Sequence, residues 1–204
     1  MSITEQLSAY RVLPVITAED VDSTVQLSRA LLSGGMRAVE ITLRTDAALD
    51  AIRAVREELP DMAVAAGTVT NPGELQAAID VGCDFHVSPG LTGQLLAAAR
   101  EAGATLVPGV ATPSEIMLGM DYGLDCFKLF PAVPVGGMAL LKALSGPFPK
   151  LAFCPTGGLS PANFRDFLAL PNVVCCGGSW MVAADLVQNK EWDEISRLAK
   201  EAMS

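Results

Sequence analysis

The stretch Val12-Leu13-Pro14-Val15-Ile16-Thr17 runs directly into Ala18-Glu19-Asp20, and this junction decides between two folds. The first six residues are mostly apolar, as in a buried strand, and the acidic residues that follow begin an amphipathic segment. An open, doubly wound sheet normally carries a glycine-rich phosphate-binding turn after its first strand. The junction contains no glycine, which favours a closed barrel over the open sheet.

The rest of the chain repeats the same unit, a short apolar segment followed by an amphipathic one. Amphipathic segments such as residues 20–33, 47–59 and 91–102 end at glycine or proline, as helices do. The apolar segments recur at intervals of about 20–26 residues, the size of a minimal strand–helix unit. They begin near Val12, Ala38, Ala63, Phe85, Thr105, Cys126, Leu151 and Val173.

Eight such units in 204 residues predict an α/β protein with the (β/α)8 TIM-barrel fold, at the short end of its length range. Residues 3–8 predict a short helix before the first strand, and residues 192–203 predict a closing helix. No linker or charge run marks a second domain, so we expect one barrel domain over residues 1–204, although length alone would also permit two small domains. The expected N-caps of the internal helices are Asp46, Asn71, Thr112 and Ser160.

The composition argues against several classes of protein. A net charge of −9 disfavours nucleic acid as a partner. No apolar run approaches the ~18 residues of a membrane helix, and residues 1–6 lack the basic start and apolar core of a signal peptide. The five cysteines are an odd number without a C-x-x-C pair, which fits a reducing compartment. We therefore expect a cytoplasmic protein with no membrane partner.

The only histidine, His86, limits the metal chemistry that the chain could support. It excludes a metal site built on several histidines, but it does not exclude one built on carboxylates. His86 follows Phe85 in a predicted strand, and we interpret it as a packed structural residue. The neighbours Cys175 and Cys176 should point to opposite faces of one strand, as small core residues.

Lys128 lies in the middle of an apolar strand-like run, Cys126-Phe127-Lys128-Leu129-Phe130-Pro131. A lysine between large apolar side chains is costly to bury in its charged form. A neutral amine is the form that attacks a carbonyl carbon to give a Schiff base. The alternative is a lysine on an edge strand or at a strand end that extends its ammonium group into water.

Strand-like residues 38–44 alternate polar and apolar side chains. With a period of two, Glu40, Thr42 and Arg44 share one face, which we expect to line the barrel interior. Glu40 and Arg44 are about 13 Å apart along an extended strand, so Glu40 should lie deeper and Arg44 nearer the rim. The same alternation lets Lys128 point inward, towards Glu40. A purely structural Glu–Arg pair is the alternative.

Hydroxyls and glycines collect where the predicted strands end, which is where such barrels place their active sites. Thr68 ends the third strand, and Ser88-Pro89-Gly90 ends the fourth. The seventh ends in Thr156-Gly157-Gly158 and the eighth in Gly177-Gly178-Ser179. Glycine-rich ends at these last two strands can build a phosphate site from backbone N–H groups. A lysine for an imine, a carboxylate, an arginine and a phosphate cradle together suggest a carbon–carbon lyase acting on a phosphorylated keto acid.

These motifs resemble the 2-keto-3-deoxy-6-phosphogluconate (KDPG) aldolase family. The resemblance runs from about Val12 to the C-terminal helix, with the motifs in the order and spacing of the family. It is carried by Glu40-Ile41-Thr42-Leu43-Arg44-Thr45, Ala66-Gly67-Thr68, Ser88-Pro89-Gly90, Phe127-Lys128-Leu129-Phe130-Pro131-Ala132, Phe153-Cys154-Pro155-Thr156-Gly157-Gly158 and Gly177-Gly178-Ser179-Trp180.

The resemblance implies a class I aldolase that needs no metal or other cofactor. Such an enzyme splits KDPG into pyruvate and glyceraldehyde 3-phosphate in the Entner–Doudoroff pathway, usually as a homotrimer. Lys128 would be the Schiff-base lysine and Glu40 the acid/base. The remaining implied site residues are Arg44, Thr68, Pro89, Phe130 and Thr156 for the substrate and Gly157, Gly158, Gly178 and Ser179 for its phosphate.

Two positions depart from the family pattern. Val133 occupies a position where the family often has an acidic residue, and His86 one where it usually has a small or aliphatic residue. Neither belongs to the implied catalytic set. Two other readings remain: a sibling aldolase for 4-hydroxy-2-oxoglutarate or the galactonate-derived phosphosugar, and a non-catalytic phosphosugar-binding barrel.

Overall fold

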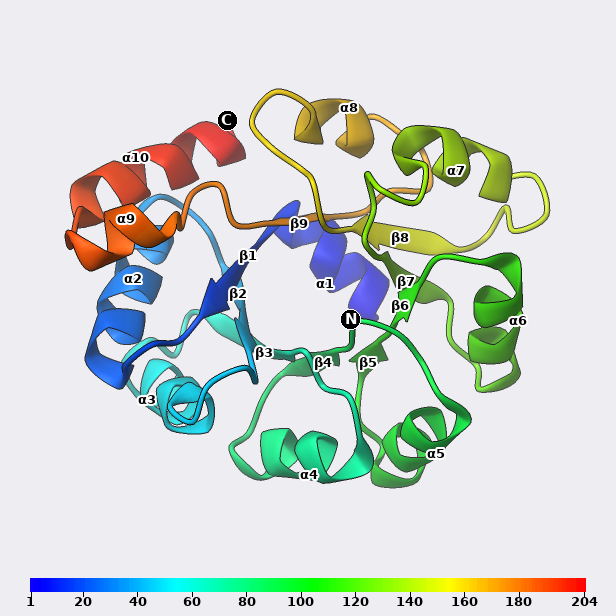
Figure 1. Ribbon diagram of the computed structural model, residues 1–204, viewed down its shortest axis with the longest axis horizontal. Coiled ribbons are helices and arrows are strands. Elements are labelled where there is room, and N and C mark those ends of the chain that lie inside the picture. The colour runs from blue at the N-terminus through cyan, green and yellow to red at the C-terminus, as the bar shows by residue number, and fades with distance from the viewer.

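The computed structural model describes all 204 residues, and its parallel strands form a ring surrounded by helices (Figure 1). This confirms the predicted α/β barrel. The strands are β1 (Val12–Thr17), β2 (Ala38–Thr42), β3 (Ala63–Gly67), β4 (Phe85–Val87), β5 (Leu106–Val107), β6 (Gly109–Val110), β7 (Cys126–Leu129), β8 (Ala152–Pro155) and β9 (Cys176–Gly178).

Ten helices accompany these strands. The predicted helix at residues 192–203 is confirmed, and the N-terminal helix extends two residues beyond its predicted end. None of the ten combines the length and the apolar character that crossing a membrane would require. They are α1 (Ile3–Tyr10), α2 (Val21–Ser33), α3 (Ala48–Glu58), α4 (Pro72–Asp80), α5 (Gly93–Ala102), α6 (Pro113–Asp121), α7 (Gly137–Leu144), α8 (Phe164–Leu168), α9 (Ala184–Gln188) and α10 (Trp192–Met203).

The ring has nine strand segments because the fifth predicted strand is interrupted. Pro108 separates β5, which pairs with β4, from β6, which pairs with β7. Proline has no N–H for the ladder, but its carbonyl still accepts a hydrogen bond from Lys128 N at 2.9 Å.

The last strand starts later than predicted. Val173 makes only an isolated bridge to Phe153, and the regular strand β9 begins at Cys176, where the chain pairs with β1. The last strand lies between β8 and β1, and Gly177 bridges both sides, to Leu13 of β1 and to Thr156 just after β8.

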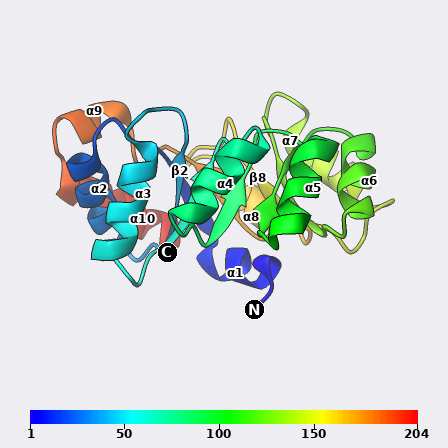
Figure 2. The same ribbon diagram turned by 90° about the horizontal axis from the view of Figure 1, so that it is seen from below.

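Helix α1 lies below the barrel, at the end where the strands begin (Figure 2). Its first turn is fixed by a capping box in which Ser2 and Glu5 bond each other's backbone N–H. Its buried Leu7 joins the small interior core, which includes Phe85 and Cys175. That core fills one end of the barrel, so polar side chains can gather only towards the other end.

The larger core lies between the strands and the surrounding helices. Val39 and Ile41 of β2 belong to it, as the alternation of that strand predicts. Cys176 also lies in this outer core, whereas Cys175 lies in the interior one, which confirms that the two cysteines point to opposite faces.

Two of the four predicted N-caps are confirmed. The Asn71 Oδ1 atom accepts from Glu74 N at 3.0 Å, and the Thr112 side chain forms a capping box with Glu115. The prediction for Asp46 is wrong, because α3 has Ala47 at its N-cap position. The prediction for Ser160 is also wrong, because α8 begins only at Phe164.

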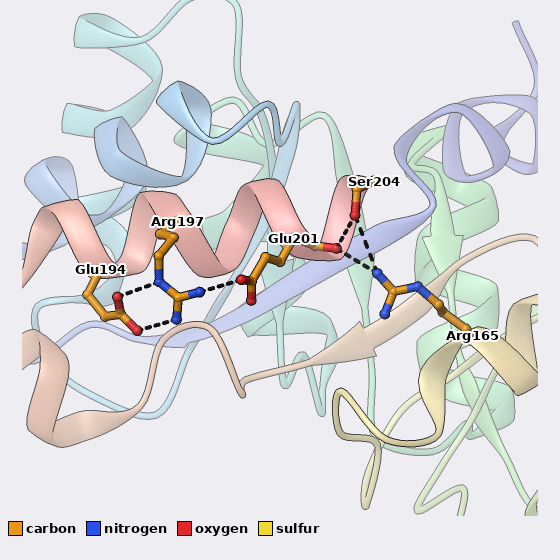
Figure 3. Close-up of polar contacts among 5 residues, drawn as sticks. All are labelled: Arg165, Glu194, Arg197, Glu201 and Ser204. Atoms are coloured by element: carbon orange, nitrogen blue, oxygen red, sulfur yellow. Dashed lines mark hydrogen bonds and ion pairs between the residues drawn. The ribbon is translucent and has the colours of Figure 1, made fainter.

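A hydrogen bond links the closing helix α10 to Arg165 of α8 (Figure 3). The Arg165 guanidinium donates to the Glu201 carbonyl at 2.7 Å, near the carboxyl end of α10. Within α10, Arg197 pairs with Glu194 and Glu201 on the helix surface. Exposed pairs of this kind contribute little stability, and α10 packs mainly against α2.

His86 of β4 is only 3% exposed, as its structural interpretation requires. Its Nδ1 lies 3.0 Å from the Thr105 carbonyl oxygen, which can only accept, so Nδ1 carries the proton of the neutral ring. The Nε2 atom is buried without a hydrogen-bond partner. Burial lowers the pKa of His86, and the bond to Thr105 only partly opposes this shift.

The depressed pKa of His86 should make the protein less stable in mild acid. Below the ordinary histidine pKa of about 6.5, the unfolded chain binds a proton that the folded chain resists. We expect the free energy of unfolding to decrease as the pH is lowered below about 6.5, by at most about 1.4 kcal/mol per pH unit. Urea denaturation of the wild type and of His86→Leu across this range measures it. The same slope in both proteins would show that His86 is not responsible.

Candidate active site

Lys128 of β7 and Glu40 of β2 meet inside the barrel. The Lys128 Nζ atom lies 3.0 Å from Glu40 Oε1 and 3.4 Å from Oε2. Lys128 is 6% and Glu40 1% exposed. The structure therefore confirms that both side chains point inward, and the edge-strand alternative for Lys128 is wrong. A buried ion pair is weak evidence for stability, because desolvating two charges offsets much of their attraction.

Phe130 borders the same lysine. Its ring centroid lies 5.2 Å from Lys128 Nζ, which is within cation–π range. Phe130 is half-buried and follows β7 directly. The amine thus has a carboxylate on one side and an aromatic ring on another.

Arg44 lies nearer the rim than Glu40, as predicted, but it is not part of the strand. Strand β2 ends at Thr42, and Arg44 occupies the following turn with an exposed side chain. Its Nε donates to Thr68 Oγ1 at 3.1 Å. A structural Glu40–Arg44 pair is thereby wrong, because each residue has another partner.

Thr68 follows β3 with a backbone φ of 59°, in the left-handed region that residues with a Cβ rarely adopt. This conformation comes immediately after Gly67 and places the Thr68 hydroxyl within reach of Arg44. Pro89 is exposed after β4, in a turn closed by a 2.6 Å bond from Ser88 Oγ to the Gly90 carbonyl.

The turn after β8 is held against the turn after β7. Ala132 N donates to the Thr156 carbonyl at 2.8 Å, and Val133 N donates to the Gly157 carbonyl at 3.0 Å. The Thr156 hydroxyl is buried without a hydrogen-bond partner. A buried hydroxyl in this state is a candidate for bonding a ligand.

Gly157 and Gly158 both have positive φ values, of 100° and 82°. A Cβ added to Gly158 would also lie 2.7 Å from Val133 Cβ. Val133 thus packs directly against the second glycine of the predicted phosphate turn. Glycine is required at Gly158 by backbone conformation and by space.

Ser179 follows β9 and Gly178 with an exposed side chain. Together with Arg44 it lines a cavity of about 300 Å³ whose other walls come from β1, α2 and the residues around α9. The apolar wall formed by Val182, Ala183 and Val187 was not predicted, because nothing in an apolar sequence marks it as facing a site.

The structure therefore brings the predicted residues together at one end of the barrel in three groups. Lys128, Glu40 and Phe130 form one, and Arg44 and Thr68 form a second. The third comprises the turns that carry Thr156, Gly157, Gly158, Gly178 and Ser179. No three histidine, cysteine, aspartate or glutamate side chains lie close enough together to hold a metal ion.

Comparison with known proteins places this arrangement in one family. The KHG/KDPG aldolase of Escherichia coli K12 is 52% identical over 197 residues, covering 97% of this chain and 92% of that protein. The 2-dehydro-3-deoxy-phosphogluconate aldolase of Dickeya dadantii is 50% identical over 198 residues, covering 97% and 93%.

A solved structure agrees with these sequences. The KDPG aldolase of Legionella pneumophila, with pyruvate captured at low pH as a covalent carbinolamine intermediate, is 40% identical to this chain. It superposes with a TM-score of 0.96 over 99% of this chain and 98% of its own. The family model for KDPG and KHG aldolases matches residues 3–198, and the chain belongs to this family.

Proposed function

We propose that the protein is a class I aldolase that cleaves KDPG to pyruvate and glyceraldehyde 3-phosphate. The observation that carries the proposal is the buried contact between Lys128 Nζ and the Glu40 carboxylate. An amine that can become a nucleophile lies beside a carboxylate that can exchange protons with it and with a bound substrate.

The reaction begins when Lys128 Nζ adds to the C2 carbonyl of the keto acid and water leaves, giving a protonated imine. Glu40 takes the proton of the C4 hydroxyl as the C3–C4 bond breaks. The bonding electrons move into the imine, so glyceraldehyde 3-phosphate leaves and an enamine remains. Glu40 returns the proton to C3, and water then hydrolyses the imine to pyruvate and free Lys128. Because the protonated imine accepts the electron pair of the broken bond, the proposed route uses no metal or other cofactor.

Arg44 and Thr68 bind the carboxylate of the keto acid. Their mutual hydrogen bond at 3.1 Å already orients the guanidinium at the rim. Pro89 borders this end of the substrate, and Phe130 packs beside the reacting carbons, next to Lys128. These contacts hold C2 within reach of the amine, which lowers the entropic part of the barrier.

The phosphate binds between the turns after β8 and β9. Gly157, Gly158 and Gly178 let the backbone approach an anion closely, and the exposed Ser179 hydroxyl adds a donor. The unpaired hydroxyl of Thr156 lies at the base of the same turns and bonds the substrate chain.

A steady-state comparison of three substrates tests the proposal: KDPG, 4-hydroxy-2-oxoglutarate and the galactonate-derived phosphosugar. KDPG should have the highest kcat/KM. Because the Escherichia coli relative is a KHG/KDPG aldolase, we also expect slower cleavage of unphosphorylated 4-hydroxy-2-oxoglutarate. Absence of cleavage with all three substrates would favour the alternative function, a non-catalytic phosphosugar-binding barrel.

A Ser179→Asp variant separates the phosphate site from the reacting centre. Its carboxylate should oppose the phosphate and lower kcat/KM for KDPG by about 10²-fold, because juxtaposed like charges cost several kcal/mol. Cleavage of 4-hydroxy-2-oxoglutarate should change little. Ser179→Ala is the matched neutral control. Equal losses with both substrates would place the phosphate elsewhere. Gly158 is less suitable, because a side chain there would displace Val133.

We also propose that the chain assembles as a homotrimer in the cytoplasm. The assembly is supported by α6, whose side chains Met117 and Met120 are 58% and 45% exposed, since exposed apolar clusters commonly mark interfaces. The location is supported by five free cysteines.

Light scattering should give a particle mass of about three times the chain mass of 21.3 kDa. The double substitution Met117→Lys with Met120→Lys should lower this particle mass. A wild-type mass of one chain would contradict the trimer.

A further inference from the structure

The interior face of β3 has no side chain at Gly67, the position that approaches the Glu40 side chain. Glu40 stands opposite Ala65 in the register of β2 and β3, and Gly67 follows two positions later on the same face. A Cβ added to Gly67 would collide with Glu40 Oε1 and would lie 2.6 Å from Cγ and 2.9 Å from Cδ. All three distances are shorter than real Cβ contacts, so something would have to move.

The backbone does not explain why this position is glycine. Gly67 belongs to a regular strand and is absent from the glycines with positive φ. Any residue can adopt its conformation, so the requirement is for space alone. The space is filled by the carboxylate group that lies 3.0 Å from Lys128 Nζ.

Glu40 has nowhere to retreat within the barrel. It is almost completely buried, and Lys128 is nearly as buried on the other side of the carboxylate. A methyl group on Gly67 would therefore push the carboxylate away from its position beside Lys128. In close-packed interiors even one added carbon forces neighbours to shift.

We propose that Gly67 is a positioning residue for proton transfer, because its missing side chain leaves the volume in which the Glu40 carboxylate lies against Lys128. This inference rests on the proposed function. It concerns the step in which the pyruvate imine on Lys128 loses a proton from C3 to Glu40 and becomes an enamine. Imine formation itself, in which Nζ bonds to C2 and water leaves, does not depend on Gly67.

Two measurements on Gly67→Ala separate these steps. Borohydride with pyruvate should still reduce the imine and add a pyruvyl group to Lys128. Exchange of the pyruvate methyl protons with deuterium oxide, followed by proton NMR, should be slower by about 10²-fold, because misplacing a catalytic group by about 1 Å has an effect of this size. The concentration of pyruvate that half-saturates trapping should change little, so the defect lies in the rate.

A double-mutant cycle with Glu40→Ala tests whether the two residues act through each other. Once Glu40 is truncated, the atoms that the new methyl group would meet are gone. Gly67→Ala should then lower neither exchange nor stability beyond the Glu40→Ala variant. If Gly67→Ala alone fails to fold, the double variant should still fold, because the collision has been removed.

Gly34→Ala is the matched steric control. A Cβ at Gly34 would also collide with its surroundings, but these are Ser196, Ala199 and Lys200 of α10, outside the barrel interior. This variant should lose thermal stability and keep both trapping and exchange in its folded form.

Normal exchange in folded Gly67→Ala, or an equal further loss in the Glu40→Ala background, would overturn the positioning role. Failure of the proposed function would look different, because wild-type protein would then show neither trapping at Lys128 nor exchange.

Discussion

Lys128→Met should abolish aldol cleavage and should also abolish covalent capture of pyruvate. Methionine fills a similar volume among apolar neighbours, but it has no amine to attack the C2 carbonyl. In the wild type, borohydride with pyruvate should inactivate the protein and add the mass of a reduced pyruvyl group to the peptide that contains Lys128. Peptide mass spectrometry gives both results in one experiment.

Lys142→Met provides the matched control, because Lys142 is exposed in the last turn of α7. It should be trapped and should turn over as the wild type does. A reduced pyruvyl group on Lys142 or Lys150 in the wild type would refute the assignment.

Since the proposed route uses no metal, EDTA should leave turnover unchanged, and a reversible loss on chelation would indicate a metal-dependent mechanism instead.

Regular strands made part of the site predictable from sequence. Alternation with a period of two holds wherever a strand is hydrogen-bonded on both sides, as β2 and β7 are. This is why Glu40 and Lys128 could be predicted to point inward.

Predictions were less accurate where strands end, because nothing local fixes how far a ladder extends. Alternation predicts Arg44 on the interior face of β2, but the strand stops at Thr42, and the hydrogen bond that Arg44 Nε donates to Thr68 places the guanidinium instead. The late start of β9 depends on its pairing with β1, a strand at the other end of the sequence.

Helix starts show the same limit. Asn71 and Thr112 stand directly before a proline that begins the helix, so local sequence determines the cap. Ser160 also precedes a proline, but there the Asn163 side chain accepts from Ser160 N at 2.9 Å and α8 begins only at Phe164. A capping residue directly before a proline is therefore compatible with a turn as well as with a helix.

Glu40→Gln should lower kcat by about 10²–10⁴-fold, the usual contribution of a general acid/base. Glutamine keeps the shape that fits against Gly67, and its amide oxygen can still accept a hydrogen bond from Lys128. However, an amide does not take up a proton at neutral pH, so the C4 hydroxyl and the C3 carbon lose their proton acceptor and donor. Imine formation should persist at least in part. Single-turnover cleavage measured beside borohydride trapping distinguishes the two steps.

Covalent trapping of pyruvate distinguishes Glu40→Gln from Lys128→Met. Both variants should be poor at turnover, but only Glu40→Gln should retain trapped pyruvate, because one removes the nucleophile and the other removes the proton carrier. Glu40→Asp is the matched variant that keeps the carboxylate and shortens its reach, and it should fall between the wild type and Glu40→Gln. Near-normal turnover by folded Glu40→Gln would mean that another group, or water, moves the proton, and the close contact of Glu40 with Lys128 would then serve only to hold the lysine in place.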